Sequence, residues 1–276
     1  MEKRIWFITG ISSGLGRALA QALIEKDAFV LGTFRQQQQA DEFNAANANK
    51  GFAFVLNLND EKQIEEVAQQ AIDKFGKIDV LVNNAGVGFA GAIEETSLPE
   101  IRAIFETNFF GTLKLTQALL PVFRRQKSGH IIQISSHGGV KAFAGFGIYN
   151  ASKFALEGFS EALAQEIAPL GIKLTIVEPG PFRTSFAGPG FGLATAVIDD
   201  YNATAGLFRE RIKGVDGKQE GDPAKAAQAI IDVANAEQPP LRLPLGKIAI
   251  GTITAKIESI QNDLNANRQI AEQAVF

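Results

Sequence analysis

Short apolar runs alternate with longer amphipathic segments from the N-terminus to about residue 180. The short runs are nearly continuous in apolar residues, as strands covered on both faces are. The longer segments repeat apolar residues at intervals of three and four, which predicts helices. We expect strands at 5–9, 29–33, 52–56, 80–82, 130–134 and 173–177, and helices at 15–26, 60–75, 98–126 and 150–168. This alternation predicts an α/β fold with a doubly wound parallel sheet and right-handed crossovers.

The remainder of the chain departs from this pattern. Residues 180–218 are rich in Gly, Phe and Ala with little regular period until a predicted helix near 197–213, so we expect a lid at about 185–215, after the sixth strand. Asp222 followed by Pro223 is typical of a helix start, here of a helix ending near Ala236. A final strand near 247–250 and a helix near 253–268 would complete a single domain spanning residues 1–276.

Composition excludes several classes of function. The 276 residues include no Cys and two His, which excludes disulfides and thiolate catalysis and predicts no metal site. A formal net charge of −3 favours neither nucleic acid nor an anionic membrane as partner. No segment approaches membrane-spanning length, and the first apolar run is too short for a signal peptide. We therefore expect a cytoplasmic protein whose partner is a small molecule.

A glycine-rich segment follows the first predicted strand and leads into a helix. Its sequence is Thr9-Gly10-Ile11-Ser12-Ser13-Gly14-Leu15-Gly16. Glycine lets a backbone turn tightly and approach a pyrophosphate at a helix N-terminus, where free N–H groups favour anions. Taken alone, the same segment is also compatible with a simple flexible turn between a strand and a helix.

Further motifs, in a fixed order from residue 5 to about 184, resemble the short-chain dehydrogenase/reductase family. Asn83-Asn84-Ala85-Gly86 follows the fourth strand, Ser136 precedes Tyr149 by thirteen residues, and Tyr149-Asn150-Ala151-Ser152-Lys153 matches the family's Y-x-x-x-K. The resemblance implies a Rossmann-like fold and a catalytic set of Asn108, Ser136, Tyr149 and Lys153. It implies cofactor binding by Gly10, Ser12, Ser13, Gly14, Leu15, Gly16, Arg35, Asn57, Leu58, Asn84, Ala85, Gly86, Tyr149, Lys153, Pro179, Gly180, Phe182 and Thr184.

The Tyr149 and Lys153 pair supports proton transfer on chemical grounds. Residues four apart share one face of a helix, so both polar groups can point into one cleft. A phenol is a poor base near neutrality, but a nearby ammonium favours the phenolate. The resemblance implies that Ser136 donates to the developing alkoxide and that Asn108 holds a water linking Lys153 to solvent. Each residue alone is more commonly a structural contact, a turn or a solvated side chain.

The end of the second strand bears on the choice of cofactor. Proteins of this fold that bind NAD place an acid there for the ribose hydroxyls, whereas Arg accommodates the 2′-phosphate of NADP. This chain has Phe34 and then Arg35, so we expect NADP(H) rather than NAD(H). Arg35 as a merely solvated side chain is the alternative. After the third strand the family commonly has Asp near the adenine, where this chain has Asn57, whose amide oxygen can still accept a hydrogen bond.

The sequence indicates an apolar substrate without identifying it. There are 21 Phe against two Tyr and one Trp, and Phe182, Phe186, Phe191, Phe143 and Phe146 are candidates for an apolar cavity, although a given Phe is more commonly core. The runs at 109–112, 149–158 and 241–244 resemble a branch with steroid- and retinol-type dehydrogenases.

We therefore expect an NADP(H)-dependent carbonyl reductase, or its reverse alcohol dehydrogenase, acting on a hydrophobic carbonyl or secondary alcohol. The alternatives are a nucleotide-binding regulatory protein and an isomerase or dehydratase that uses the same tyrosine. Relatives commonly pair the helices expected at 98–126 and 150–168, so the resemblance also implies a homo-oligomer, either a dimer or a tetramer.

Overall fold

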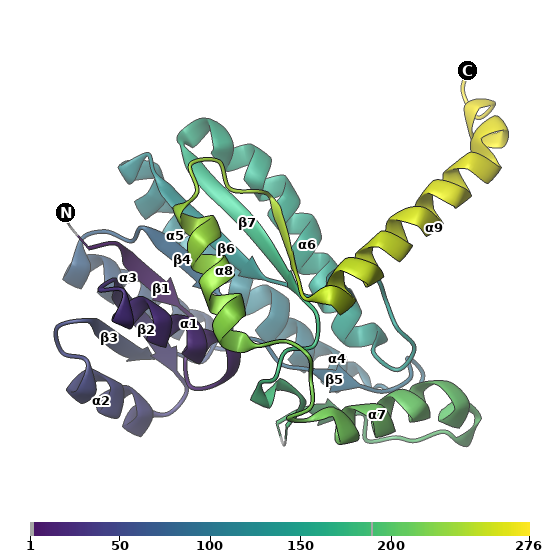
Figure 1. The fold of residues 1–276 in the computed structure, drawn as a ribbon, viewed down its shortest axis with the longest axis horizontal. Coiled ribbons are helices and arrows are strands. Elements are labelled where there is room, and N and C mark those ends of the chain that lie inside the picture. The colour runs from purple at the N-terminus through teal and green to yellow at the C-terminus, as the bar shows by residue number, and fades with distance from the viewer. Residues whose placement is uncertain (1–2, 189) are drawn as a thin grey trace.

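The computed structural model, which describes residues 3–188 and 190–276, is built on one parallel sheet (Figure 1). The strand order is β3-β2-β1-β4-β6-β7-β9, and every neighbouring pair in it is parallel. The predicted doubly wound fold is confirmed. The strands are β1 (Ile5–Ile8), β2 (Phe29–Phe34), β3 (Gly51–Val55), β4 (Val80–Asn83), β6 (Gly129–Ile134), β7 (Ile172–Pro179) and β9 (Arg242–Leu245).

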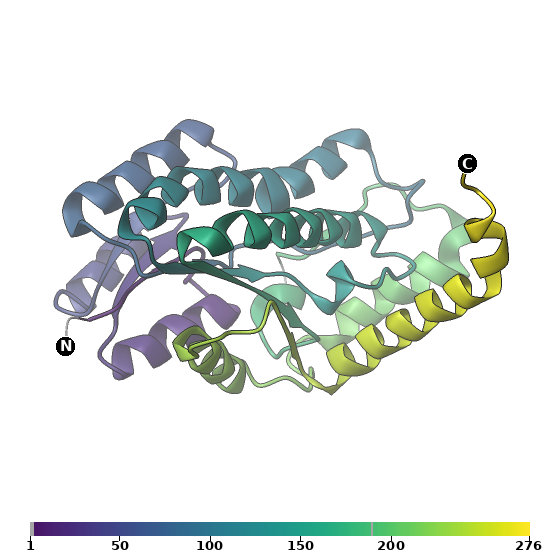
Figure 2. The same ribbon diagram turned by 90° about the horizontal axis from the view of Figure 1, so that it is seen from above.

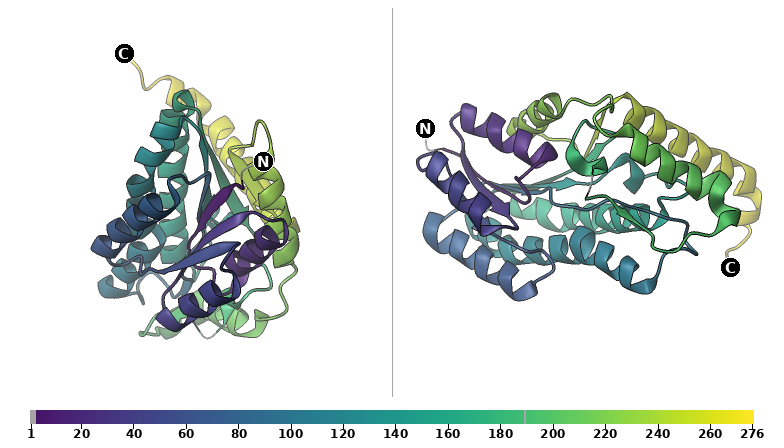
Figure 3. Two further views of the ribbon diagram at one scale, coloured as in Figure 1. Left: turned by 90° about the vertical axis from the view of Figure 1, so that its left-hand side faces the viewer. Right: turned by 90° about the horizontal axis from the view of Figure 1, so that it is seen from below.

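Helices cover both faces of the sheet, as Figure 2 and Figure 3 show. One face carries α1 (Gly14–Glu25), α2 (Gln37–Ala46) and α8 (Pro223–Asn235), and the other carries α3 (Glu61–Phe75), α5 (Gly111–Gln126) and α6 (Gly147–Ile167). Each layer buries its own apolar cluster, because alternate side chains of a strand point to opposite faces. Asp222 caps α8 by accepting from the N–H groups of Ala224 and Lys225, as its sequence predicts.

Several elements differ from the expectation. The helix α2 is not predicted, because its glutamine-rich sequence buries only Ala40 and carries no apolar stripe. The predicted strand at 247–250 is wrong, since these residues open α9 (Lys247–Glu272) and the last strand is Arg242–Leu245. A short apolar run does not separate strand from helix by period. Pro244 is tolerated in β9 because β9 lies at the edge of the sheet.

The long helix expected at 98–126 is interrupted. It consists of α4 (Leu98–Phe105), a π-helical turn η1 (Glu106–Phe110) and α5. Extra residues in a helical turn commonly mark a functional position. The apolar periodicity continues on both sides of the turn, which is why the sequence shows one helix.

The segment after β7 folds over the carboxyl ends of the strands (Figure 1). It includes β8 (Gly192–Leu193), which pairs with β5 (Phe89–Ala90), and α7 (Leu207–Val215), so the predicted helix begins later than expected. Buried Glu95 accepts from Ile198 N at 2.9 Å and from Arg209 Nη2 at 2.6 Å. This segment, where the sequence predicts a lid, is held by hydrogen bonds to the residues after β5.

The C-terminal helix α9 starts at the carboxyl end of β9 and runs away from the body (Figure 1). It extends beyond the predicted 253–268 at both ends. None of the helices in residues 3–188 and 190–276 is both long enough and apolar enough to cross a membrane.

We predict that truncating Leu119 strongly destabilises the fold. Its side chain is fully buried on α5 against the sheet, so Leu119→Ala should lower the free energy of unfolding by about 2–5 kcal/mol. The matched control is Leu264→Ala on α9, whose side chain is 58% exposed and which should change stability by less than about 0.5 kcal/mol. Urea unfolding measures both, and equal effects would contradict this assignment of the core.

Candidate active site

The glycine-rich segment forms a tight turn between β1 and α1. Gly10 and Gly14 adopt positive φ angles of 70° and 59°, a conformation that favours glycine. A Cβ on Gly16 would lie 2.3 Å from Asn84 Nδ2, so the close packing of α1 requires glycine there too. Helix α1 has no side-chain cap and no acid in its first turn, and Ser12 and Ser13 are exposed. Its N-terminal N–H groups are therefore arranged to receive an anion such as a pyrophosphate.

Asn84 fixes the shape of this turn from the end of β4. Its Nδ2 donates to the carbonyls of Thr9 and Gly10 at 2.8 and 3.1 Å. In return, the Thr9 hydroxyl oxygen accepts from the backbone N–H groups of Asn84 and Ala85, each at 2.9 Å. The predicted cofactor residue Asn84 thus shapes the glycine turn through its side chain, and Ala85 lies directly against Gly10.

The end of β2 lies beside the same turn. The Gly10 N–H donates to Thr33 Oγ1 at 3.0 Å, which ties the turn to this strand. Phe34 is buried against Phe43, whereas Arg35 is exposed. Arg17 lines a surface hollow of about 600 Å³ together with Ser12 and Phe34. Sequence reasoning did not single out Arg17, although its place directly after the third glycine was a usable signal.

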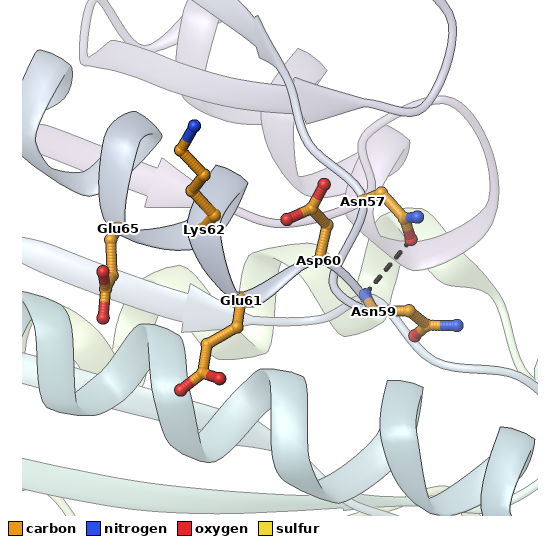
Figure 4. A pocket seen from close by; sticks show the side chains of 6 residues that line it. All are labelled: Asn57, Asn59, Asp60, Glu61, Lys62 and Glu65. Atoms are coloured by element: carbon orange, nitrogen blue, oxygen red, sulfur yellow. Dashed lines mark hydrogen bonds between the residues drawn. The ribbon is translucent and has the colours of Figure 1, made fainter.

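Asn57 and Leu58 follow β3, and Figure 4 shows the Asn57 side chain directed toward Asn59. The Asn57 Oδ1 accepts from Asn59 N at 3.1 Å, which leaves one lone pair of that oxygen for another donor. Leu58 is buried, and its backbone carbonyl lies so close to Gly111 that no side chain fits there. The role of both residues in adenine binding stays a prediction.

The catalytic set expected from the sequence comes together at the carboxyl ends of β4 and β6. Tyr149 and Lys153 lie on one face of α6, with Lys153 Nζ 5.9 Å from the centre of the phenol ring. The Lys153 ammonium donates to the carbonyl of Ile134 at 2.9 Å, and Ser136 follows that strand. A Cβ on Gly86 would meet Asn108 Oδ1 at 3.2 Å and Lys153 Nζ at 3.5 Å. All four predicted catalytic side chains are buried.

The π-helical turn η1 directs Asn108 inward. Its Oδ1 accepts from Val87 N at 2.8 Å, and its Nδ2 donates to Val87 O at 3.0 Å and to Ser152 Oγ at 3.1 Å. The amide is therefore held on both sides by the segment after β4 and by α6. Its position beside Lys153 is compatible with the predicted relay.

Burial controls the protonation of the pair. Burial raises the pKa of Tyr149 to about 12, and the neighbouring Ser136 hydroxyl opposes that rise. Burial also lowers the pKa of Lys153 to about 8, and Glu157 opposes that fall. The Tyr149 phenol therefore keeps its proton at neutral pH. The Lys153 ammonium begins to lose its proton not far above neutral pH.

The segment after β7 reaches the glycine turn. Gly180 N donates to the Leu245 carbonyl at 2.9 Å, and Pro179 ends the strand. A Cβ on Gly14 would meet Thr184 at 3.3 Å, so Thr184 lies against the turn. Phe182 instead packs against Gly221, which indicates a structural role for its ring.

Aromatic rings enclose Tyr149. Phe146 stacks on its ring with centres 4.2 Å apart, and Phe186 meets it edge-on at 5.7 Å. Phe191 lies 5.9 Å from Phe186, and Phe208, which sequence reasoning missed, lies 4.8 Å from Phe146. Of the five candidates for an apolar cavity, Phe146, Phe186 and Phe191 thus come together. The other two do not join them, since Phe143 packs on His137 and Phe182 packs on Gly221.

Comparisons with known proteins agree with this architecture. Residues 4–190 match the family model described as short chain dehydrogenase. Oxidoreductase BOA17 of Botryotinia fuckeliana is 39% identical over 248 residues, covering 90% of each chain. The 3-ketodihydrosphingosine reductase of Bacteroides thetaiotaomicron is 36% identical, covering 94% of this chain and 93% of its own. Human retinol dehydrogenase 8 is also 36% identical, covering 87% of this chain and 80% of its own, in keeping with the expected branch.

Solved structures show the same fold. A short-chain dehydrogenase from Streptomyces avermitilis superposes with a TM-score of 0.93 at 41% identity, covering 100% of both chains. ElxO with NADP bound gives a TM-score of 0.72 at 26% identity, covering 88% of this chain and 97% of its own. A Burkholderia phymatum protein in complex with NAD, at 20% identity, covers 95% of each chain with a TM-score of 0.82 and supports the fold alone. The chain therefore belongs to the short-chain dehydrogenase family of oxidoreductases.

Proposed function

We propose that the protein is an NADP(H)-dependent oxidoreductase that interconverts an apolar carbonyl compound and its secondary alcohol. One observation carries the proposal: Asn108, Ser136, Tyr149 and Lys153 form one buried cluster next to a glycine turn that is arranged for a pyrophosphate. An acid, a hydrogen-bond donor and a cation around one point are the groups that carbonyl reduction requires.

Each of the four side chains has its own role in the proposed reaction. The bound nicotinamide would supply or accept the hydride. In the reducing direction Tyr149 gives its proton to the carbonyl oxygen, and Ser136 donates a hydrogen bond to the same oxygen as negative charge develops there. The Lys153 ammonium stabilises the phenolate that remains. Asn108 holds the segment after β4 against α6, next to the path by which Lys153 regains a proton.

The cofactor preference rests on the end of β2. No acid stands there to repel a 2′-phosphate, and Arg35 is exposed beside the buried Phe34. Arg17, on the first turn of α1, adds a second exposed guanidinium near this position. Arg binds phosphate in a fork of two hydrogen bonds, so both residues favour NADP(H) over NAD(H).

The substrate class follows from the rings above Tyr149. Phe146, Phe186, Phe191 and Phe208 present aromatic surface without a polar group, and a phosphorylated sugar would find no partner among them. The names of two relatives, a 3-ketodihydrosphingosine reductase and a retinol dehydrogenase, refer to compounds with long apolar parts. A hydrophobic ketone or aldehyde therefore fits this site best.

We also propose a homo-oligomer formed through α4, α5 and α6. Phe110 in the η1 turn and Phe154 on α6 are half exposed, on the helices that the resemblance implies as the pairing surface. Burying such rings against a second copy would remove apolar surface from water. The cytoplasmic location expected from the sequence stays a prediction.

We predict that Tyr149→Phe abolishes turnover but leaves the cofactor bound. The change removes the acid and keeps the ring that stacks on Phe146, so the rate should fall at least about 100-fold while NADPH affinity stays within about twofold. Consumption of NADPH with a panel of hydrophobic ketones and aldehydes gives the rate, and NADPH fluorescence gives the affinity. A variant with near-normal turnover would refute the role of Tyr149.

We predict that Arg35→Asp reverses cofactor preference. An acid at this position repels the 2′-phosphate and can accept from the ribose hydroxyls, so kcat/KM for NADPH relative to NADH should fall at least about 100-fold. Arg125→Asp makes the same charge change at the far end of α5, before β6, and should leave the ratio unaltered. An unchanged ratio in Arg35→Asp would exclude Arg35 from phosphate binding.

We predict that Phe186→Ala weakens binding of bulky apolar substrates. Its ring is 40% exposed and contacts Tyr149 edge-on, so its loss should raise KM for such substrates about tenfold and leave the melting temperature within about 2 °C. Leu193→Ala, on β8 and 38% exposed, serves as the control for a lid change away from the ring contacts. Equal KM values for the wild type and Phe186→Ala would place the substrate elsewhere.

A further inference from the structure

One arginine links the sheet edge to the catalytic helix. Arg242 on β9 donates to Glu178 on β7 at 2.6 Å and to Glu161 on α6 at 3.1 Å. It also forms an ion pair with Glu157 on α6. Glu157 and Glu178 are 5% and 1% exposed, whereas the side chain of Glu161 is 55% exposed. The runs at 149–158 and 241–244, which the sequence singled out, thus meet in space.

Stability alone is a weak explanation for this cluster. Two buried carboxylates share one guanidinium, and burial raises the pKa of both Glu157 and Glu178. Among the residues that the structure describes, Glu178 Oε2 has no hydrogen-bond partner. Replacing a buried ion cluster by apolar side chains of similar volume is commonly neutral or stabilising. The position of the cluster relative to the active site offers a functional reason for it.

Glu157 lies one helical turn beyond Lys153 on α6, so the two side chains share a face of the helix. The Lys153 ammonium is buried and donates to the uncharged carbonyl of Ile134. Burial lowers the pKa of Lys153, and the charge that opposes this effect is that of Glu157. The hydroxyl of Ser135 and the guanidinium of Arg242 in turn favour the charged form of Glu157.

We propose that Glu157, held by Arg242, is a positioning residue that keeps the buried Lys153 ammonium charged for catalysis. It does not touch the reacting atoms; its carboxylate acts through Lys153. The inference rests on the proposed function for its kinetic consequence, but the electrostatic link itself does not require turnover.

The surrounding charges set the sign of the effect. The charged or titratable groups facing Glu157 are Lys153 and Glu161 on α6, Glu178 on β7 and Arg242 on β9, and those facing Lys153 are Tyr149 and Glu157. A nearby negative charge favours the protonated form of a titrating group. Removing the charge of Glu157 therefore lowers the apparent pKa of the Tyr149 and Lys153 pair. Carbonyl reduction needs the protonated pair. The fall in its rate at alkaline pH therefore begins at a lower pH when this charge is removed.

The kinetic test is the pH profile of kcat/KM for carbonyl reduction by the full-length enzyme. In Glu157→Gln the alkaline fall of kcat/KM should move about one pH unit lower. At pH values above the fall, kcat/KM should be about tenfold below that of the wild type, with little change near pH 6. Glu161→Gln, one turn farther along α6 and exposed, should keep the wild-type profile. A profile that coincides with the wild type, or falls equally at every pH, overturns the proposal.

Substitutions of Arg242 separate charge from structure. Arg242→Lys keeps a cation beside Glu157 and should retain the wild-type profile. Arg242→Met removes the cation that partly neutralises Glu157 and Glu178, so the uncompensated carboxylates should move the alkaline fall to higher pH, opposite to its direction in Glu157→Gln. Matching shifts in the Met and Lys variants would contradict the proposal.

A direct titration distinguishes failure of this inference from failure of the proposed function. The carbon-13 signal of the Lys153 side chain, assigned with a Lys153→Arg variant, can be followed by NMR against pH without substrate. Its midpoint should lie about one pH unit lower in Glu157→Gln than in the wild type. An inactive wild type with this shift would refute the oxidoreductase assignment alone, and an unchanged midpoint in an active enzyme would refute the role of Glu157.

Discussion

The parallel sheet is the constraint on which the rest of the molecule depends. Because neighbouring strands of the seven-stranded sheet run in the same direction, the segments that follow β1, β4, β6 and β7 emerge at one edge. The glycine turn follows β1, Asn84 follows β4, Ser136 follows β6 and Thr184 follows β7. Candidate site residues spread over 175 residues of sequence therefore meet at one place. Backbone hydrogen bonds hold this edge together, as between Thr9 and the segment after β4.

Burial shifts the protonation equilibria of both Tyr149 and Lys153. A phenol and an ammonium withdrawn from water both tend toward their neutral forms, which keeps Tyr149 an acid and leaves Lys153 close to losing its proton. A fixed negative charge behind the lysine offsets that tendency. Glu157 on α6 supplies this charge, and Arg242 on the edge strand β9 holds its carboxylate, so the electrostatic environment of the site extends to the edge of the sheet.

The lid combines polar attachment with an apolar inner surface. Glu95 and Glu100 anchor it through hydrogen bonds to Ile198, Thr195 and Arg209. Its inner side presents Phe186 and Phe191 to Tyr149 and Phe146. The polar contacts fix where this segment lies, and the rings give it an apolar inner surface. The two functions reside in different residues, so the apolar surface can vary without releasing the lid.

The sequence by itself predicted the parallel α/β fold and the glycine turn, because both depend on a local period or a short spacing, and its resemblance to a known family named four catalytic candidates. Only the tertiary structure decided which distant residues meet. It placed Phe208 beside Phe146 and left Phe143 and Phe182 elsewhere, since one Phe in a strand or loop has the same local signature in a core as in a cavity. It also made a helix of 247–250, where a short apolar run fits either structure. The partnership of Glu157 with Arg242 depends on a contact across 85 residues, and no local pattern encodes such a contact.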